Sequence, residues 1–288
     1  MDLEQIYWYF KLGKPKHRAS IFDLRNQPGK YIQQPIFFLS TGRCGTQWFS
    51  RLLSRDPKLA VFHKPEPTLA MQGRAVYEIM MKNRGSLSAE VNSLIKELLW
   101  SARENHFRYT YKTGKRYVET NNYITFFAPF LFKIFPDARF VHLIRHPGEF
   151  VRSGVNRDYY SESGSDDIKR IEPVTGSMAE EWSSLGQIKK VAWLWNETNL
   201  FISNFLKTLP GGQYRRFNFN QLEATRIQEI LHFLGSGIPL RRIHKLIPKK
   251  INALAAPSVK PFEEWSEKEK QVVVGVTGDL ARGWGYSV

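Results

Sequence analysis

Short apolar runs recur along the chain, separated by longer segments in which apolar residues return at helical spacing. The runs 36–39, 59–62 and 140–144 are each followed by polar or glycine-containing turns, which is the pattern of buried strands. The segments 116–119 and 216–219 indicate two further strands. Strands that alternate with helices predict an α/β fold of three layers, with a central parallel sheet flanked by helices.

The segments between these runs carry apolar residues three and four positions apart. This spacing predicts a helix between Trp48 and Leu53, helical structure from about 68 to 107, and a late helix from Ile227 to Leu234. An apolar stripe from Trp182 to Leu206 predicts one long helix. Pro147 is typical of the first position of a helix, here one that follows the strand before it.

These elements define the expected domain organisation. Residues 1–34 are polar and aromatic with scattered Pro and Gly, and we expect an N-terminal extension packed on the domain. Residues 35–288 then form a single α/β domain with a helical insertion at about 68–115. The segment 161–178 is rich in Ser, Gly and charge and is the longest predicted loop.

Composition narrows the class of protein. Hydrophobic residues make up 42% of the 288 residues, enough to fill a core. Lys and Arg outnumber Asp and Glu by 42 to 27, and this excess favours anionic ligands: nucleic acid, acidic lipid headgroups, anionic glycans or a polyphosphorylated nucleotide. A single cysteine, Cys44, excludes an intramolecular disulfide. No signal peptide or spanning segment is recognisable, so we expect a cytoplasmic protein without a transmembrane segment.

The first chemical motif follows the first strand. The segment 40–48 reads Ser-Thr-Gly-Arg-Cys-Gly-Thr-Gln-Trp and leads into a helix, so its backbone N–H groups predict a cradle for phosphate or sulfate. Gly42 and Gly45 permit a tight turn, and Arg43 adds positive charge. A Walker A motif would continue with Lys-Ser/Thr to reach Mg²⁺. The Thr-Gln found here argues against an ATPase or kinase, and we expect no metal. Taken alone, the motif is also compatible with an ordinary strand–turn–helix corner.

The second motif is at the end of the strand 140–144. The run 135–147 reads Phe-Pro-Asp-Ala-Arg-Phe-Val-His-Leu-Ile-Arg-His-Pro, and Ser153 follows Arg145 by eight residues. An arginine at the carboxyl end of a strand and a hydroxyl two turns along the next helix can converge on one phosphate. The planar guanidinium matches two phosphate oxygens at once.

Both motifs resemble those of sulfotransferases. The segment 42–48 is similar to their 5′-phosphosulfate loop, Pro-(Arg/Lys)-Ser-Gly-Thr-Thr-(Trp/Leu), with Gly, Cys and Gln replacing the proline, the serine and the second threonine. Arg145 and Ser153 have the spacing of the family's 3′-phosphate clamp, and the similarity extends from residue 35 to about 286.

The resemblance implies a P-loop-like fold and transfer of a sulfuryl group from 3′-phosphoadenosine 5′-phosphosulfate (PAPS) to a hydroxyl or amine. The product nucleotide would be adenosine 3′,5′-bisphosphate. The residues it implies for donor binding are Gly42, Arg43, Cys44, Gly45, Thr46, Gln47, Arg145 and Ser153.

The resemblance also implies a Glu or His as general base, and three residues qualify. His63 and Glu66 follow the second strand, where Lys64 occupies a position that is acidic in many relatives. Glu119 is similar to the strand-end Glu of some glycan sulfotransferases. All three stay open as the base, and Arg43 is expected to stabilise charge on the leaving phosphate.

Other functions stay open as well. One is a degenerate sulfotransferase-like protein that binds the donor without turnover. Another is a basic protein that binds nucleotides, nucleic acid or anionic glycans, although no zinc-finger spacing or RNA-recognition motif is present and no nucleic acid is expected. The acceptor is a small molecule, lipid or glycan, and the basic balance favours an anionic one. Neither its identity nor the oligomeric state follows from the sequence.

Overall fold

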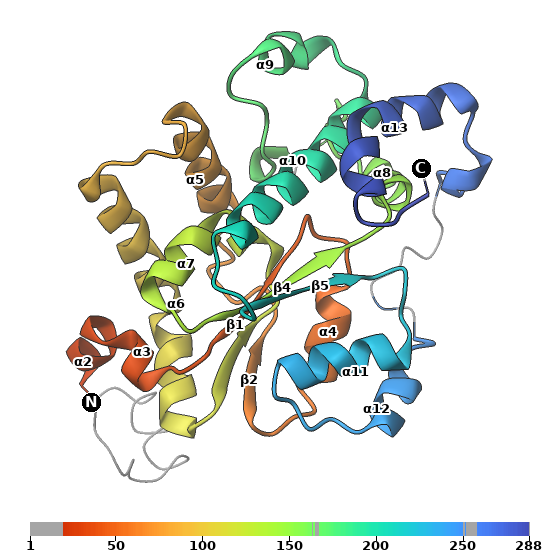
Figure 1. Cartoon of the computed structure of the whole chain (residues 1–288). Helices are drawn as coiled ribbons and strands as arrows, with labels where there is room; N and C mark the ends of the chain where they lie inside the picture. The colour runs from red at the N-terminus through yellow and green to blue at the C-terminus, as the bar shows by residue number, and fades with distance from the viewer. Residues whose placement is uncertain (1–19, 163, 165–166, 250, 252–257, 288) are drawn as a thin grey trace.

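The chain folds around a parallel sheet (Figure 1). This computed structural model describes residues 20–162, 164, 167–249, 251 and 258–287. Within them five strands have the order β2-β3-β1-β4-β5, and every neighbouring pair is parallel. The strands are β1 (Ile36–Leu39), β2 (Leu59–Phe62), β3 (Arg116–Glu119), β4 (Arg139–Ile144) and β5 (Tyr214–Asn218). The predicted α/β fold with a parallel sheet is confirmed.

The strand order places β1 at the centre of the sheet. β1 and β2 are joined by α4 (Thr46–Leu53), as predicted, but β3 lies between them. Ile36 of β1 and Val61 of β2 are both paired with Val118 of β3. The loop that follows β1 therefore emerges in the middle of the sheet edge, between the ends of β3 and β4.

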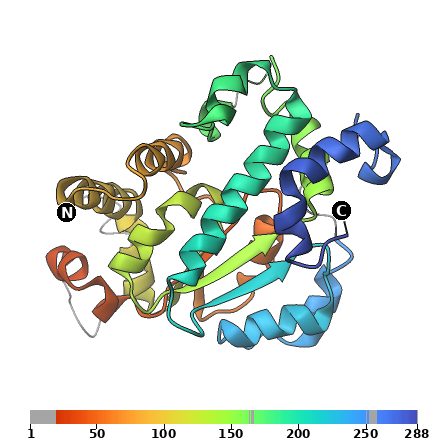
Figure 2. The same ribbon diagram turned by 45° about the horizontal axis from the view of Figure 1, so that its top comes forward.

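Helices cover both faces of the sheet (Figures 1 and 2). Those on one face are α4, α11 (Ala224–Phe233) and α12 (Leu240–Leu246). Those on the other face include α6 (Ala89–Thr113), α7 (Ala128–Ile134) and α10 (Gln187–Lys207). Two further helices, α8 (Pro147–Val155) and α13 (Glu267–Arg282), pack against α10.

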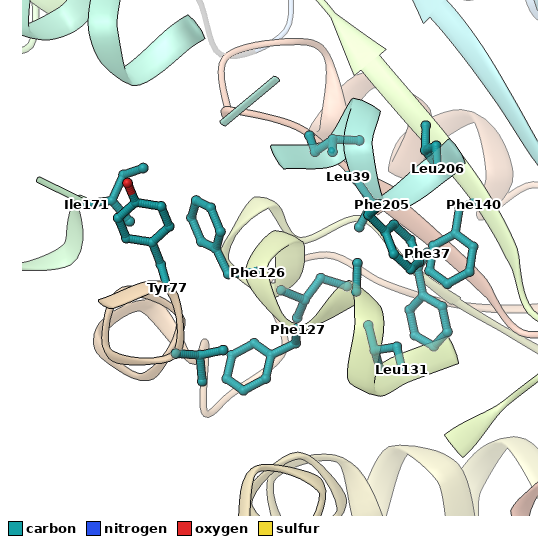
Figure 3. Close-up of a cluster of buried hydrophobic side chains, with 14 of the residues drawn as sticks. Phe37, Leu39, Tyr77, Phe126, Phe127, Leu131, Phe140, Ile171, Phe205 and Leu206 are labelled. Atoms are coloured by element: carbon teal, nitrogen blue, oxygen red, sulfur yellow. The ribbon is translucent and has the colours of Figure 1, made fainter. Parts of the chain in front are cut away.

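Successive side chains of β1 enter two different cores. Ile36 and Phe38 pack on the side of α4 and α11, whereas Phe37 and Leu39 pack on the side of α7 and α10. All four are fully buried because helices cover both faces, so the strand reads as one continuous apolar run. Figure 3 shows part of the second core, with Phe37, Leu39, Phe127, Phe140 and Phe205 among its labelled residues.

The predicted insertion is helical but interrupted. It contains α5 (Ala70–Lys82) and α6, which are separated by residues 83–88. Ser88 starts α6, because its Oγ accepts a hydrogen bond from the backbone N–H of Val91 (3.3 Å). The insertion lies against the side of the sheet that is covered by α7 and α10.

Several elements, most of them short, have no strong signal in the sequence. They are η1 (Asn122–Phe127), η2 (Asp167–Lys169), α9 (Ser177–Glu181), η3 (Trp182–Ser184) and η4 (Phe262–Glu264), together with α7, α12 and α13. The long helix predicted from Trp182 begins instead at Gln187, because η3 is a separate 3₁₀ turn. The predicted loop 161–178 contains η2 and the start of α9, with residues 163 and 165–166 outside the described part. Among the helices described, none has the length and apolarity needed to cross a membrane.

Two short helices precede the sheet, α2 (Ile21–Asn26) and α3 (Pro28–Tyr31). Leu24 and Ile32 are buried in the core on the α10 side, and Arg25 forms an ion pair with Glu97 of α6. Most of the predicted N-terminal extension, residues 1–19, lies outside the described residues. The division of the chain into an extension and one domain stays a prediction.

Candidate active site

A cavity of about 730 Å³ opens at the carboxyl edge of the sheet. Residues that follow each of the five strands form its wall. After β1, β2 and β3 these are Thr41, Gly42, Arg43, Gly45, Thr46, Gln47, Trp48, His63, Lys64, Asn122 and Tyr123. After β4 and β5 they include Arg145, Glu149, Arg152, Ser153, Asn156, Arg157, Tyr159, Phe219, Asn220 and Leu222.

The cavity is centred between β1 and β4. The chain leaves β1 into α4 on one face of the sheet and leaves β4 into α8, which packs with α10 on the other face. Neighbouring parallel strands whose connections leave to opposite faces open a crevice, and ligands of open α/β sheets bind in such crevices. The two predicted motifs border this crevice.

The loop after β1 has a backbone conformation suited to anions. Gly42, Arg43 and Gly45 have φ values of 81°, 57° and 88°. A Cβ at Gly45 would lie 1.9 Å from the ring of Phe219, so both φ and space require glycine there. Left-handed residues on both sides of Cys44, just before the N-terminus of α4, suit the concave arrangement of backbone N–H donors that a phosphate or sulfate cradle needs.

The sequence predicts Cys44 as a donor-binding residue, but the structure places its side chain away from the cavity. Its side chain is 1% exposed and packs in the core beneath α4 instead of lining the cavity. Its Sγ donates a hydrogen bond to the carbonyl oxygen of Gly42 (2.9 Å), and burial raises the pKa of the thiol to about 11. The thiol is therefore neutral at pH 7, and it supports the shape of the loop from the side that faces the core.

Arg145 and Ser153 lie at the same cavity as the first motif. The Oγ of Ser153, on α8, accepts a hydrogen bond from Nη1 of Arg157 (3.0 Å) and lies 3.5 Å from Nε of Arg43. Nη1 of Arg145 donates to the carbonyl oxygen of Arg43 (3.3 Å). The two motifs, about a hundred residues apart in sequence, are thus in direct contact across the crevice.

Positive charge dominates this cavity. Among the described residues that line it there is one carboxylate, Glu149, against six cations: Arg43, Lys64, Arg145, Arg152, Arg157 and Lys249. Glu149 is shared, because its Oε2 lies 3.0 Å from Nη2 of Arg145 and 3.7 Å from Nη1 of Arg152. Burial lowers the pKa of Arg43 and of Arg157, and the charge of Arg145 lowers both further. Cations that repel one another in this way are stabilised when a polyanion binds between them.

His63 is the predicted base that lies in the cavity. The ring is half-buried, and its Nδ1 lies 2.9 Å from the backbone oxygen of Thr120 and 3.0 Å from the Oγ1 of the same residue. A carbonyl oxygen only accepts, so this contact assigns the proton of the neutral ring to Nδ1 and the lone pair to Nε2. Burial lowers the pKa of His63, the hydrogen bond with Thr120 offsets part of this shift, and the charge of Lys64 lowers the pKa further. The ring is therefore neutral at pH 7 and able to accept a proton.

The two carboxylate candidates lie outside the cavity. Glu66 is exposed, and its Oε2 accepts a hydrogen bond from the backbone N–H of Thr68 (3.2 Å). Glu119 is 1% exposed and forms an ion pair with Arg103 of α6 (2.8 Å). Alternate residues of a strand face opposite sides, and Glu119 shares with Tyr117 the side that α6 covers. Its carboxylate therefore enters the core instead of the sheet edge.

The structure also adds residues that the sequence did not indicate. Arg152, Arg157 and Lys249 contribute positive charge, and Phe219 forms part of the apolar wall beside Trp48. Arg157 lies just beyond the end of α8, four residues after Ser153, and its Nη1 still reaches the Oγ of Ser153, so this spacing was a signal for it. Lys249 and Phe219 reach the cavity through tertiary structure, and no local pattern marks them.

The fold and the cavity together define a class of protein: an α/β protein with a cationic cavity on strand–loop–helix corners at the centre of a parallel sheet. The chain belongs to the sulfotransferase family, whose sequence profile matches residues 35–235. No curated protein matches the sequence significantly.

Solved structures share this fold. The sulfotransferase domain from the curacin biosynthetic pathway superposes with a TM-score of 0.51 at 17% identity, covering 88% of this chain and 98% of that domain. A sulfotransferase from Mycobacterium avium gives 0.50 at 11% identity, covering 92% and 81% of the two chains. The sulfotransferase domain of the Synechococcus PCC 7002 olefin synthase gives 0.50 at 14% identity, covering 96% and 98%. At these identities the likeness establishes the fold.

Proposed function

We propose that this protein transfers the sulfuryl group of PAPS to a hydroxyl or amine of an acceptor. Membership of the sulfotransferase family makes sulfuryl transfer the reaction to test first. The observation that carries the proposal is the contact between the two motifs, in which Ser153 lies between Arg43 and Arg157. A nucleotide with phosphate groups at both its 3′ and 5′ positions is the kind of ligand that two adjacent cationic corners recognise.

The donor would be held along its whole length. The loop around Gly42 and Gly45 suits the 5′-phosphosulfate, and Arg145, Ser153 and Arg157 suit the 3′-phosphate. An apolar wall is available for the adenine ring, since Trp48, Phe219, Leu222, Ile247 and Ile251 also line the cavity.

The chain's own residues would then carry out the transfer. Nε2 of His63 accepts the proton of the acceptor as the new bond to sulfur forms. On the other side, the loop N–H groups and Arg43 stabilise the negative charge that collects on the 5′-phosphate as its bond to sulfur breaks. The products are the sulfated acceptor and adenosine 3′,5′-bisphosphate, and the proton leaves through His63.

Calorimetry with adenosine 3′,5′-bisphosphate tests the donor half of the proposal. We expect micromolar or tighter binding without Mg²⁺, and weaker binding of adenosine 5′-monophosphate, which lacks the 3′-phosphate. Preferential binding of Mg²⁺–ATP would contradict the proposal. Transfer of labelled sulfate from PAPS to a panel of small-molecule, lipid and glycan acceptors then tests turnover. Nucleotide binding without transfer to any acceptor would indicate a donor-binding protein that lacks catalysis.

A further inference from the structure

Glu119 is surrounded by hydrogen-bond donors on all sides. Its Oε2 accepts from Nε of Arg103 (2.9 Å) and from the hydroxyl of Tyr117 (2.6 Å). Its Oε1 accepts from Nη2 of Arg103 (2.8 Å) and from Nδ2 of Asn121 (3.1 Å). The pair is fully buried, with both side chains 1% exposed. A carboxylate in this position has no access to a substrate, and the contacts of its partners indicate another role.

Those partners hold the segment that follows His63. Nη1 of Arg103 donates to the backbone oxygen of Pro67 (2.6 Å), and Nδ2 of Asn121 donates to the backbone oxygen of Thr68 (2.9 Å). Two consecutive carbonyl groups, four and five residues after His63, are therefore tied to the Glu119 ion pair. The loop between β2 and α5 is anchored at this point.

The residue between Glu119 and Asn121 contacts His63 itself. The backbone oxygen and Oγ1 of Thr120 both lie within 3.0 Å of Nδ1 of His63, and the backbone N–H of Thr120 donates to the carbonyl oxygen of Phe62 (2.9 Å). Residues at the end of β3 thus hold His63 at three points: the residue before His63, the ring of His63 and the loop after it.

We propose that Glu119, Thr120 and Asn121, together with Arg103, form a positioning device that fixes the orientation and tautomer of His63. In this assignment Glu119 acts through its neighbours and does not exchange a proton with the acceptor. The inference rests on the proposed function only in taking His63 as the base. It explains why a strand-end glutamate is present next to the site although its carboxylate is directed away from it.

NMR of ¹⁵N-labelled imidazole rings provides the test, because it reads His63 directly and needs no turnover. Loss of the His63 signals in His63→Gln assigns them. In the wild-type protein we expect the Nδ1–H tautomer. In Asn121→Ala we expect a mixture with the Nε2–H tautomer and a pKa that rises toward the usual value of histidine, because a loosened loop exposes the ring and burial is the largest cause of its lowered pKa. Turnover should fall at least about 10-fold, with the acid limb of the pH–rate profile following the new pKa.

Removing one partner of the ion pair can unfold the protein, so the pair is best removed as a unit. Arg103→Met combined with Glu119→Gln deletes both charges and the contact of Arg103 to the backbone oxygen of Pro67, and removing both partners leaves no uncompensated buried charge. We expect the same change in the tautomer and pKa of His63 as in Asn121→Ala. The affinity for adenosine 3′,5′-bisphosphate should stay within about twofold of wild type, because the donor corners do not contact this pair. Glu229→Gln, which breaks an exposed ion pair with Arg226, is the matched control.

The outcomes separate this inference from the proposed function. Folded Asn121→Ala and double variants in which the tautomer and pKa of His63 equal those of wild type would overturn the positioning role. Loss of turnover in the double variant with an unchanged His63 would return Glu119 to direct participation in catalysis. A wild-type protein that neither binds the bisphosphate nor transfers sulfate would refute the proposed function, while the NMR result would still decide whether β3 positions His63.

Discussion

Charge is arranged in opposite ways in the wall of the cavity and in the core behind it. In the proposed donor half, at the ends of β1 and β4, cations outnumber carboxylates among the described lining residues, and Arg145 and Arg152 share the single carboxylate, Glu149. Behind the proposed acceptor half, at the ends of β2 and β3, Glu119 and Arg103 form a one-to-one pair in the core, outside the cavity. Excess charge of one sign marks a place for a ligand of the opposite sign, whereas a balanced buried pair marks a structural anchor.

This difference decides which charged residues take part in chemistry. A buried ion pair gains little stability over apolar packing, since desolvation offsets its attraction. Its benefit here is geometric, because the pair is tied to the loop carbonyls of Pro67 and Thr68. His63, the base that we propose for this half, has a lowered pKa and is neutral at pH 7. Variants that lose one charge or one base at a time test this difference.

The largest expected effect is on turnover in His63→Gln. Loss of a general base lowers the rate by about 10²- to 10⁴-fold, and the affinity for adenosine 3′,5′-bisphosphate should stay unchanged because the donor half is intact. In the wild-type protein the rate should rise with pH through the pKa of His63, which lies below 6.5, and then level off, because only the neutral ring accepts a proton. A variant with full turnover and the same acid limb would show that another group is the base.

Glu119→Gln should have the next largest effect, on stability. It leaves the Arg103 charge buried without its counter-ion, which costs about 3–5 kcal/mol in the free energy of unfolding. Urea unfolding followed by circular dichroism measures the change. The exposed pair of Arg226 and Glu229 is the reference, and Glu229→Gln should shift the midpoint very little. Equal midpoints for the two variants would mean that the buried pair does not anchor the acceptor half.

Arg145→Ala should weaken donor binding by about 10- to 100-fold, the loss expected for charge-assisted hydrogen bonds worth about 1.5–3 kcal/mol. The loss should be confined to nucleotides that carry a 3′-phosphate, so the variant should bind adenosine 3′,5′-bisphosphate and adenosine 5′-monophosphate with similar affinity. Arg226→Ala, outside the cavity, controls for lost net charge. A variant that still prefers the 3′-phosphorylated nucleotide would remove Arg145 from the clamp.

The donor half was more predictable from sequence than the acceptor half for a physical reason. Its motifs are local: a strand, a glycine turn and a helix place Arg43 and Arg145 at strand ends, and parallel strands bring these ends to one edge. The role of Glu119 depends on Arg103, which arrives from a helix sixteen residues earlier in the chain. The sequence shows that Glu119 ends a strand. It does not show that α6 covers the side of the strand that Glu119 faces, so that the carboxylate meets Arg103 in the core.

The remaining differences between expectation and structure also arise where local sequence does not set a contact or a helix end. Phe219 and Lys249 reach the cavity only once β5 and the segment after α12 are in place, so no spacing in the sequence identifies them. The break between α5 and α6 lies within a stretch whose apolar spacing continues on both sides, and the cap at Ser88 is a weak local signal beside that pattern. Periodicity predicts which segments are helical more reliably than where each one ends.

The smallest expected effects concern Cys44, which lies behind the donor half. Because the thiol is 1% exposed and its pKa is raised to about 11, it should react with alkylating reagents only when the loop opens, and unfolding in urea should speed the reaction at least about 100-fold. Cys44→Ser keeps a donor for the carbonyl oxygen of Gly42, so donor affinity should stay within about twofold and stability within about 1 kcal/mol. Mass spectrometry of the alkylated chain and calorimetry with adenosine 3′,5′-bisphosphate measure the two quantities. A tenfold gain in affinity on restoring the family's serine would show that the side chain at this position reaches the donor, and that the cradle depends on more than its backbone.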